Sequence, residues 1–249
     1  IRDSIGIIPA RYASTRFPGK PLADIQGKPM IQRVYEQATK AGSLSAVIVA
    51  TDDERIDQAV KEFGGEVIMT SPAHLSGTDR CNEALSLLSG SGRSFDVVVN
   101  IQGDEPYIHP GQIDLVASCF SDPEVSIATL MKRIQTDEEL LNPSVNKVIV
   151  DRFRNAIYFS RHPIPFVQNA DQEQWLSRHV HYKHIGIYAY RSAMLQEISS
   201  LEPSTLERAE SLEQLRWIEN GYMIRVEETT LESHSVDMPG DISKFTNRP

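Results

Sequence analysis

The chain has 249 residues, of which 40% are hydrophobic and 24% charged, as in an ordinary globular protein. Its formal net charge of -9 argues against a nonspecific nucleic-acid binder and a binder of membrane surfaces, because both use broad basic faces. No apolar stretch approaches the roughly 20 residues of a membrane span, and the first residues lack a signal-peptide layout, so we expect a cytoplasmic protein.

The first 70 residues alternate between strand and helix patterns. We expect strands over 4–10, 45–51 and 66–70, with helices over 29–42 and 53–65. Gly42 ends the first helix, and Gly64 and Gly65 end the second. The strands are continuous apolar runs, which is typical of a parallel sheet covered on both faces.

The alternation continues to about residue 134. We expect a loop and a helix over 76–90, capped by Thr78, then an apolar strand that runs from Phe95 into the acids of "QGDEP". A helix over 110–120, with Pro110 in its first turn, and a strand over 125–134 follow. Parallel sheets bind ligands outside the carboxyl ends of their strands. The segments 7–22, 76–80 and 102–106 all follow strands, so we expect them to meet at one cleft.

The pattern changes from about Asn146. Strands over 147–151, 155–160 and 181–191 have no long helices between them, which indicates an antiparallel extension for a lid or an oligomer contact. An amphipathic helix over 211–221, a strand over 222–229 and a short helix over 239–245 end the chain. We predict a Rossmann-like α/β fold, with a mostly parallel sheet, helices on both faces and a smaller antiparallel subregion. It forms one domain over 1–249, with an inserted lid or dimerisation subregion over approximately 130–190.

Three cations stand on the loop after the first strand. Arg11, Arg16 and Lys20 are separated by small residues, Pro18 and Gly19. The loop has neither the GxxxxGK[ST] motif nor GxGxxG. Small residues still let backbone N–H groups approach a polyphosphate, and Arg and Lys add charge-assisted hydrogen bonds. The alternative is a surface turn with three solvated cations, and spacing does not decide between the two.

Two aspartates are candidate metal ligands. Asp104 stands at the mouth of a buried strand, where a carboxylate is costly unless it is paired or metal-bound. Mg²⁺ commonly takes one or two carboxylates together with substrate phosphate oxygens. The alternative is an ordinary acidic turn. Asp237, taken alone, reads as a helix cap before Pro239, and only a metal shared with Asp104 would make it a ligand.

The histidines and cysteines give weaker signals. His181 and His184 would face opposite sides of a strand, so we reject a zinc pair. His184 fits a substrate-binding role and a structural role equally well. Cys81 and Cys119 fit no metal pattern, and we expect two free, buried thiols.

Several motifs occur in one order across nearly the whole chain: "IIPARYASTRFPGKPL", "SGTDR", "NIQGDEP", "FSR", "HIGIYAYR", "LEQLRW" and "VDMPGDI". With them the chain closely resembles the 3-deoxy-manno-octulosonate (Kdo) cytidylyltransferases, a branch of the CMP-sugar synthetases. The resemblance implies a nucleotide-diphospho-sugar transferase fold and a homodimer. It also implies a Mg²⁺-dependent reaction of CTP with Kdo to CMP-Kdo and pyrophosphate, for lipopolysaccharide synthesis in the cytoplasm of a Gram-negative bacterium.

The resemblance also implies roles for single residues. The triphosphate of CTP would be bound by Arg11, Arg16 and Lys20, and its cytidine by Ser76, Gly77 and Arg80. Magnesium would be bound by Asp104 and Asp237, which would form the catalytic set together with Arg16 and Lys20. Kdo would be contacted by Gln102, Arg161, His184, Tyr188, Glu213 and Gln214. On their helix alone, the last two residues read as part of a solvated face.

The resemblance implies attack of the anomeric hydroxyl of Kdo on the α-phosphorus of CTP. One departure from the family pattern is Asp79 of "SGTDR", where Glu is more usual. Two alternatives stay open: a synthetase of the CMP-sialic-acid type, and a noncatalytic nucleotide-binding regulator on the same fold.

Overall fold

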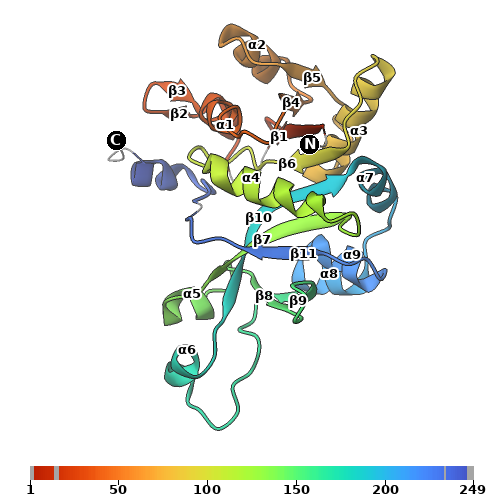
Figure 1. Ribbon diagram of the computed structural model, residues 1–249. Coiled ribbons are helices and arrows are strands. Elements are labelled where there is room, and N and C mark those ends of the chain that lie inside the picture. The colour runs from red at the N-terminus through yellow and green to blue at the C-terminus, as the bar shows by residue number, and fades with distance from the viewer. Residues whose placement is uncertain (1–2, 14–16, 233, 246–249) are drawn as a thin grey trace.

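A mixed sheet runs through the middle of the molecule (Figure 1) in the computed structural model, which describes residues 3–13, 17–232 and 234–245. Its strands follow the order β11 (Arg225–Glu228), β7 (Ile127–Arg133), β10 (Tyr182–Arg191), β6 (Val97–Asn100), β1 (Ser4–Ala10), β4 (Ala46–Thr51) and β5 (Val67–Met69). β6, β1, β4 and β5 are parallel neighbours, β11 is parallel to β7, and β10 is antiparallel to both β6 and β7. The predicted mostly parallel sheet is confirmed.

Helices cover both faces of the sheet, because its central strands are apolar on both sides. In β1, Ile5 and Ile7 join one buried cluster while Ile8 and Ala10 join the other. The first cluster includes side chains of α3 (Gly77–Gly90), α7 (Ser192–Ser199) and α9 (Gln214–Glu219), and the second those of α1 (Met30–Ala38), α2 (Glu54–Glu62) and α4 (Pro110–Ser118). The predicted two-sided covering is therefore confirmed.

The strand order places a crevice at the end of β1. β1 pairs with β4 on one side and with β6 on the other. The chain leaves β1 through η1 (Lys20–Leu22) and the small strands β2 (Asp24–Ile25) and β3 (Lys28–Pro29) into α1, whereas β6 follows α3 on the opposite face. Ligands of open α/β sheets bind at the point where the connections after two neighbouring strands run to opposite faces of the sheet. The fold thus directs attention to the carboxyl ends of β1 and β6.

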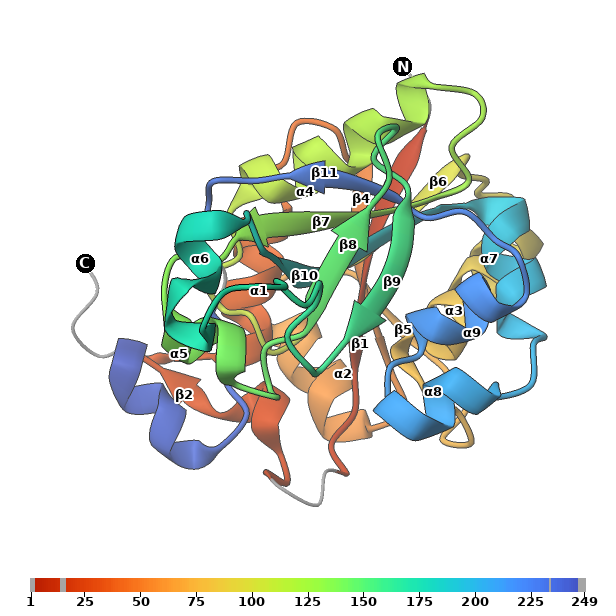
Figure 2. The same ribbon diagram turned by 90° about the horizontal axis from the view of Figure 1, so that it is seen from below.

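An antiparallel hairpin extends the sheet beyond β10. β8 (Lys147–Val150) pairs with β9 (Ala156–Ser160) and with the start of β10. Nearby lie α5 (Asp137–Leu141), η3 (Gln172–Gln174) and α6 (Trp175–Arg178). Figure 1 shows this part at the lower end of the molecule, away from α2 and β5, and Figure 2, seen from below, shows β8 and β9 in front. The antiparallel strands expected after Asn146 are confirmed, while the division of the chain into a domain with an insert stays a prediction.

Some element predictions were wrong in detail. Ser76, not Thr78, caps α3, because its hydroxyl accepts the N–H of Asp79 at 3.1 Å. The helix expected over 211–221 is confined to α9, and α8 (Thr205–Glu210) precedes it. Ser211 separates the two helices, since its φ of 52° is left-handed and cannot continue a helix. α7 was not predicted.

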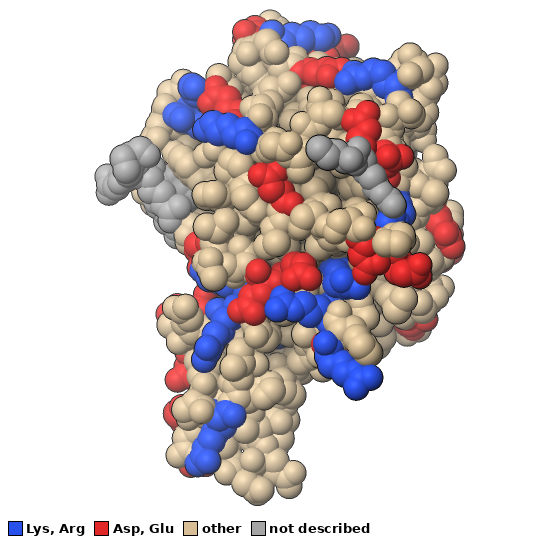
Figure 3. Space-filling model, viewed as in Figure 1, with Lys and Arg blue, Asp and Glu red and all other residues tan. Residues whose placement is uncertain are grey.

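The remaining features are two short 3₁₀ helices, the cysteines and the distribution of surface charge. η2 (Cys119–Ser121) follows α4, and η4 (Pro239–Phe245) lies where a short helix was expected. Cys81 and Cys119 are free and buried, as predicted. Among the described residues, no helix has the length and apolarity to cross a membrane. On the face drawn in Figure 3, basic and acidic side chains lie side by side across the middle of the molecule.

Candidate functional site

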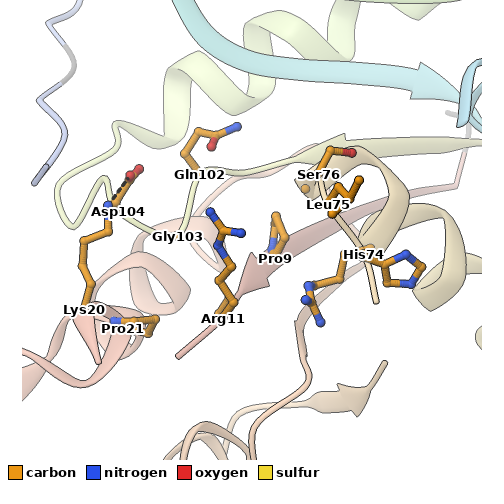
Figure 4. Close-up of a pocket in the computed structure, with 13 residues that line it drawn as sticks. Pro9, Arg11, Lys20, Pro21, His74, Leu75, Ser76, Gln102, Gly103 and Asp104 are labelled. Carbon is orange, nitrogen blue, oxygen red and sulfur yellow. Dashed lines mark hydrogen bonds and ion pairs between the residues drawn. The ribbon is translucent and has the colours of Figure 1, made fainter. Parts of the chain in front are cut away.

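A pocket opens where the loops after β1 and β6 meet the start of α3 (Figure 4). Its lining residues are Pro9, Ala10, Arg11, Lys20, Pro21, His74, Leu75, Ser76, Gly77, Arg80, Gln102, Gly103 and Asp104. The expected meeting of three segments, far apart in the sequence, at one cleft is confirmed. Arg16 lies outside the described residues.

Two glycines let these segments approach closely. A Cβ on Gly103 would lie 2.9 Å from the carbonyl oxygen of Pro9, which is closer than real Cβ contacts. A Cβ on Gly77 would lie 3.2 Å from Cγ of the same proline. The loop after β6 and the first turn of α3 therefore both pack against the end of β1, and larger side chains would force the pocket apart.

Lys20 joins the cationic loop to the acidic one. Its Nζ lies 2.8 Å from Oδ2 of Asp104 and 2.9 Å from the carbonyl oxygen of Val236. The N–H of Val236 in turn donates to the carbonyl oxygen of Asp104 at 2.9 Å. Asp237, the next residue, is exposed and accepts a hydrogen bond from Ser235. The structure thus brings the two segments that carry the predicted metal ligands side by side.

These two aspartates fit a magnesium ion in their chemistry. Carboxylate oxygens are the hard ligands that Mg²⁺ prefers, and one or two suffice when phosphates complete its shell. The described residues contain no cluster of three or more His, Cys, Asp or Glu side chains suited to a metal. A divalent ion bound by two carboxylates would complete its shell with substrate phosphate oxygens and water.

Arg80 forms a fixed, buried wall of the pocket. Only 3% of the residue is exposed. Its guanidinium donates to Oδ2 of Asp52 at 3.0 Å and to the hydroxyl of Thr70 at 2.6 Å. Asp52 directly follows β4, and this acid at a strand end was the signal that sequence reasoning missed. Asp52 neutralises the charge of Arg80, and these hydrogen bonds hold the guanidinium in position.

The rim before α3 adds residues that were not predicted. His74 lines the pocket and pairs through Nε2 with the Glu83 carboxylate, which also accepts the N–H of Ser71. Leu75 is 89% exposed at the same rim. Ser76 follows and caps α3, whose N-terminal N–H groups attract anions. The signal that could have found them is their position next to "SGTDR".

The predicted sugar-binding residues of β10 lie deeper. Gln102 of the pocket donates from Nε2 to the carbonyl oxygen of Gly186 at 3.0 Å. The rings of His184 and Tyr188 lie 5.2 Å apart on either side of that glycine in the sequence. Burial lowers the pKa of His184 to about 3 and raises that of Tyr188, so both side chains are uncharged at neutral pH. They can act there as hydrogen-bonding groups and not as charges.

Gln214 is buried and Glu213 is half-buried, so their interpretation as a solvated face was wrong. Oε2 of Glu213 accepts the hydroxyl of Thr78 at 2.8 Å. Burial raises the pKa of Glu213, and hydrogen bonds from Thr78 and Ser76 oppose that shift. Ser76 also lines the pocket, and the carboxylate therefore lies directly behind the pocket wall.

Arg161 lies outside the pocket of the three loops. Its guanidinium donates to carbonyl oxygens of Glu210 at 2.6 Å, Pro143 at 3.2 Å and Ser211 at 3.2 Å. It lines a separate hollow with His162 and Glu210. These contacts hold it at the end of α8, a few residues before the predicted Kdo ligands Glu213 and Gln214, but its own role stays a prediction.

Comparisons with known proteins agree with this geometry. A family model described as "Cytidylyltransferase" matches residues 5–229. The 3-deoxy-manno-octulosonate cytidylyltransferase of Parabacteroides distasonis is 56% identical, covering 96% of this chain and 95% of its own. That of Bacteroides thetaiotaomicron is 58% identical, covering 96% of this chain and 94% of its own.

Solved structures give the same picture. CMP:2-keto-3-deoxy-manno-octonic acid synthetase complexed with CTP is similar with a TM-score of 0.89 and 43% identity, covering 98% of this chain and 97% of its own. A cytidylyltransferase from Leptospira borgpetersenii shares the fold alone, with a TM-score of 0.60 and 15% identity over 99% of this chain and 86% of its own.

Proposed function

Because the chain belongs to the cytidylyltransferase family, we propose that it transfers the cytidylyl group of CTP to Kdo, giving CMP-Kdo and pyrophosphate. The observation that carries this proposal is the pocket, in which a cationic loop, a helix N-terminus and Asp104 meet beside buried polar groups of β10 and α9. The relatives with 56% and 58% identity carry the name of this activity. We place the reaction in lipopolysaccharide precursor synthesis, in the cytoplasm of a Gram-negative bacterium.

The pocket residues divide the work between binding and positioning. Arg11 and Lys20 bind phosphate oxygens. The cytidine is bound at the start of α3, by Ser76, Gly77 and Arg80. Charge builds on the leaving pyrophosphate as the anomeric hydroxyl attacks the α-phosphorus, so fixed cations lower the barrier. Lys20 must exchange its bond to Asp104 for a phosphate oxygen, which frees the carboxylate.

We propose Asp104 and Asp237 as the residues that hold Mg²⁺. The proximity of their segments through Val236 supports this assignment. A bound Mg²⁺ would supply charge neutralisation for the phosphates of CTP. The freed Asp104 carboxylate supplies the negative charge that such an ion needs.

We also propose a homodimer formed by the region 130–190. Large apolar side chains are exposed there: Phe153 at 60%, Ile157 at 53% and Phe166 at 73%. Exposed apolar side chains grouped on one part of a protein mark interaction surfaces. Sedimentation of the purified protein over a range of concentrations tests the proposal, and a monomer at every concentration would refute it.

The activity is tested by counting pyrophosphate. The protein is incubated with CTP and Mg²⁺ together with Kdo, with N-acetylneuraminic acid, or with no sugar. Release that requires Kdo supports the proposal. Release with the sialic acid instead indicates the related synthetase, and CTP binding without release in any mixture indicates a noncatalytic regulator.

A further inference from the structure

β10 is interrupted by a bulge at the edge of the pocket. Ile185 pairs with Leu130 of β7, and the next pair joins Tyr188 to Thr129, so Gly186 and Ile187 have no partners in that register. On one side of the bulge β10 pairs with β6, and on the other with β8. The bulge therefore marks the junction between the parallel sheet and the antiparallel extension. Bulges near binding sites commonly redirect side chains.

One buried hydroxyl holds this bulge. Thr129 is fully buried in β7, and its Oγ1 lies 2.7 Å from the carbonyl oxygen of Ile187 and 3.2 Å from that of Ile185. Carbonyl oxygens only accept hydrogen bonds, so the single hydroxyl proton is directed to them. This contact fixes the path of the backbone on both sides of Gly186. That glycine then presents its carbonyl oxygen to Gln102 in the pocket.

The same hydroxyl orients a histidine. Oγ1 of Thr129 lies 2.9 Å from Nε2 of His184. Because the hydroxyl proton is used on a carbonyl oxygen, the hydroxyl oxygen accepts a hydrogen bond from Nε2–H of His184, and Nδ1 is left as an acceptor. The ring of Phe159 lies 5.0 Å from the His184 ring and restricts its tilt. An uncharged ring with a free acceptor suits a sugar hydroxyl.

We propose that Thr129 is a positioning residue for sugar recognition, because it pins the bulge of β10 on which His184 and Tyr188 stand. The inference rests on the proposed function, since it presumes a hydroxylated sugar acid as the second substrate. Thr129 does not line the pocket, so it acts only through its neighbours. The nucleotide should therefore be bound almost equally well without its hydroxyl.

The test compares Thr129→Val, which removes the hydroxyl at nearly constant shape, with Thr129→Ser, which keeps it. Pyrophosphate release is measured against Kdo at saturating CTP, and against CTP at saturating Kdo. We expect Thr129→Val to raise KM for Kdo about tenfold, the worth of one buried hydrogen bond, and to leave KM for CTP within about twofold. Thr129→Ser should behave like the wild type.

A matched control is Thr51→Val. Thr51 is also fully buried, on β4, and its hydroxyl oxygen accepts the N–H of Asp53 at 3.3 Å. This variant tests whether the loss of any buried threonine hydroxyl in the sheet raises KM for Kdo. Equal KM values for Kdo in Thr129→Val and the wild type, or a parallel rise for both substrates, would overturn the inference. So would a rise of similar size in Thr129→Ser.

A second readout needs no activity. The ¹⁵N shifts of the His184 ring, measured without substrates, report which nitrogen carries the proton. We expect protonated Nε2 in the wild type and in Thr129→Ser, and a mixture of tautomers in Thr129→Val. If Thr129→Val does not fold, Thr129→Ala replaces it. If the wild type does not use Kdo, the proposed function fails, while an unchanged His184 tautomer in the variant separately refutes the role of Thr129.

Discussion

The candidate site has two halves, the pocket itself and the groups of β10 and α9 behind it, and they are built in opposite ways. The half formed by the loops after β1 and β6 uses ion pairs near the surface, such as that between Lys20 and Asp104. The half behind the pocket, on β10 and at the start of α9, uses half-buried groups with buried hydroxyl partners, as His184 has Thr129 and Glu213 has Thr78. Exposed ion pairs can exchange partners, whereas buried hydrogen bonds fix geometry. The first arrangement suits a highly charged phosphate chain, and the second suits the hydroxyls of a sugar.

The largest effect should come from the charged half. We expect Asp104→Ala to lower kcat by about 10²–10³, because it removes a preorganised group that acts on the transferring phosphate. The fold should persist, since the side chain is 27% exposed. Steady-state pyrophosphate release and thermal unfolding of the same samples measure the two quantities.

Asp114→Ala is the matched control for this variant. The Asp114 carboxylate also accepts a hydrogen bond, from the N–H of Ser43 at 2.8 Å, but it lies outside the pocket lining. We expect a small loss of stability and wild-type turnover. Wild-type turnover in Asp104→Ala would refute the placement of the reacting phosphate beside β6.

A substitution in the buried half should change both the activity and the stability of the protein. We expect Glu213→Gln to lower kcat/KM for Kdo about 10- to 100-fold, which corresponds to about 1.4–2.8 kcal/mol of lost sugar contact. Burial raises the pKa of Glu213 above its usual 4.5, so its ionised form costs folding free energy. The variant should therefore be the more stable protein at neutral pH.

The difference in stability between Glu213→Gln and the wild type should depend on pH. Below pH 4.5 the carboxyl group is protonated in the folded and the unfolded chain, and the wild type and Glu213→Gln should be equally stable. The advantage of the variant should grow as pH rises through the raised pKa. The neighbouring charged and titratable groups are Arg216, Asp79, Cys81, Tyr188 and Tyr190. Urea unfolding at several pH values measures the difference, and a constant difference would contradict the assignment.

Removal of the partner of Arg80 should have an intermediate effect. Asp52→Asn leaves a buried guanidinium with Thr70 and a backbone carbonyl as partners. We expect a loss of about 2 kcal/mol in stability, less than for a fully buried pair because the Asp52 side chain is 16% exposed. KM for CTP should rise about tenfold, and KM for Kdo should hardly change. A larger effect on Kdo than on CTP would reverse the division of the pocket into halves.

The charged half could be predicted from the sequence, and the buried half only in part. Apolar runs followed by Arg11, Ser76 and Asp104 indicated strand ends, and parallel strand ends meet at one edge. The pairing of Arg80 with Asp52 was not predictable, because it depends on the lateral order of β4 and β1. Arg16 lies outside the described residues, and its role stays a prediction.

The buried half depends on contacts between segments distant in the sequence. Glu213 lies two positions after the left-handed Ser211 and meets Thr78, 135 positions earlier. Its helix pattern therefore falsely indicated a solvent-facing side chain. In the motif "HIGIY", little besides Gly186 indicates a bulge in β10. Thr129 looks like any strand residue, and only the register of β7 against β10 shows what its hydroxyl holds.

The smallest effect should come from the segment that links β11 to Asp237. Glu232 anchors it through ion pairs with Lys183, at 2.8 Å, and with Lys132. Because the Glu232 side chain is 38% exposed, such a pair contributes about 0.2–1 kcal/mol. We expect Glu232→Gln to raise the Mg²⁺ concentration for half-maximal activity about two- to threefold. High salt should shrink the difference, since it screens the pair in the wild type.

Glu139→Gln separates anchoring of this segment from the loss of a charge. Glu139 binds the same Lys183 at 2.6 Å but belongs to α5, so its removal spares the link to Asp237. Titration of Mg²⁺ should therefore give a wild-type midpoint for Glu139→Gln and a shifted one for Glu232→Gln. Equal shifts in both would mean that the lysine charge alone matters. In that case the C-terminal segment would owe its position to Val236, whose backbone pairs with Asp104 and accepts from Lys20.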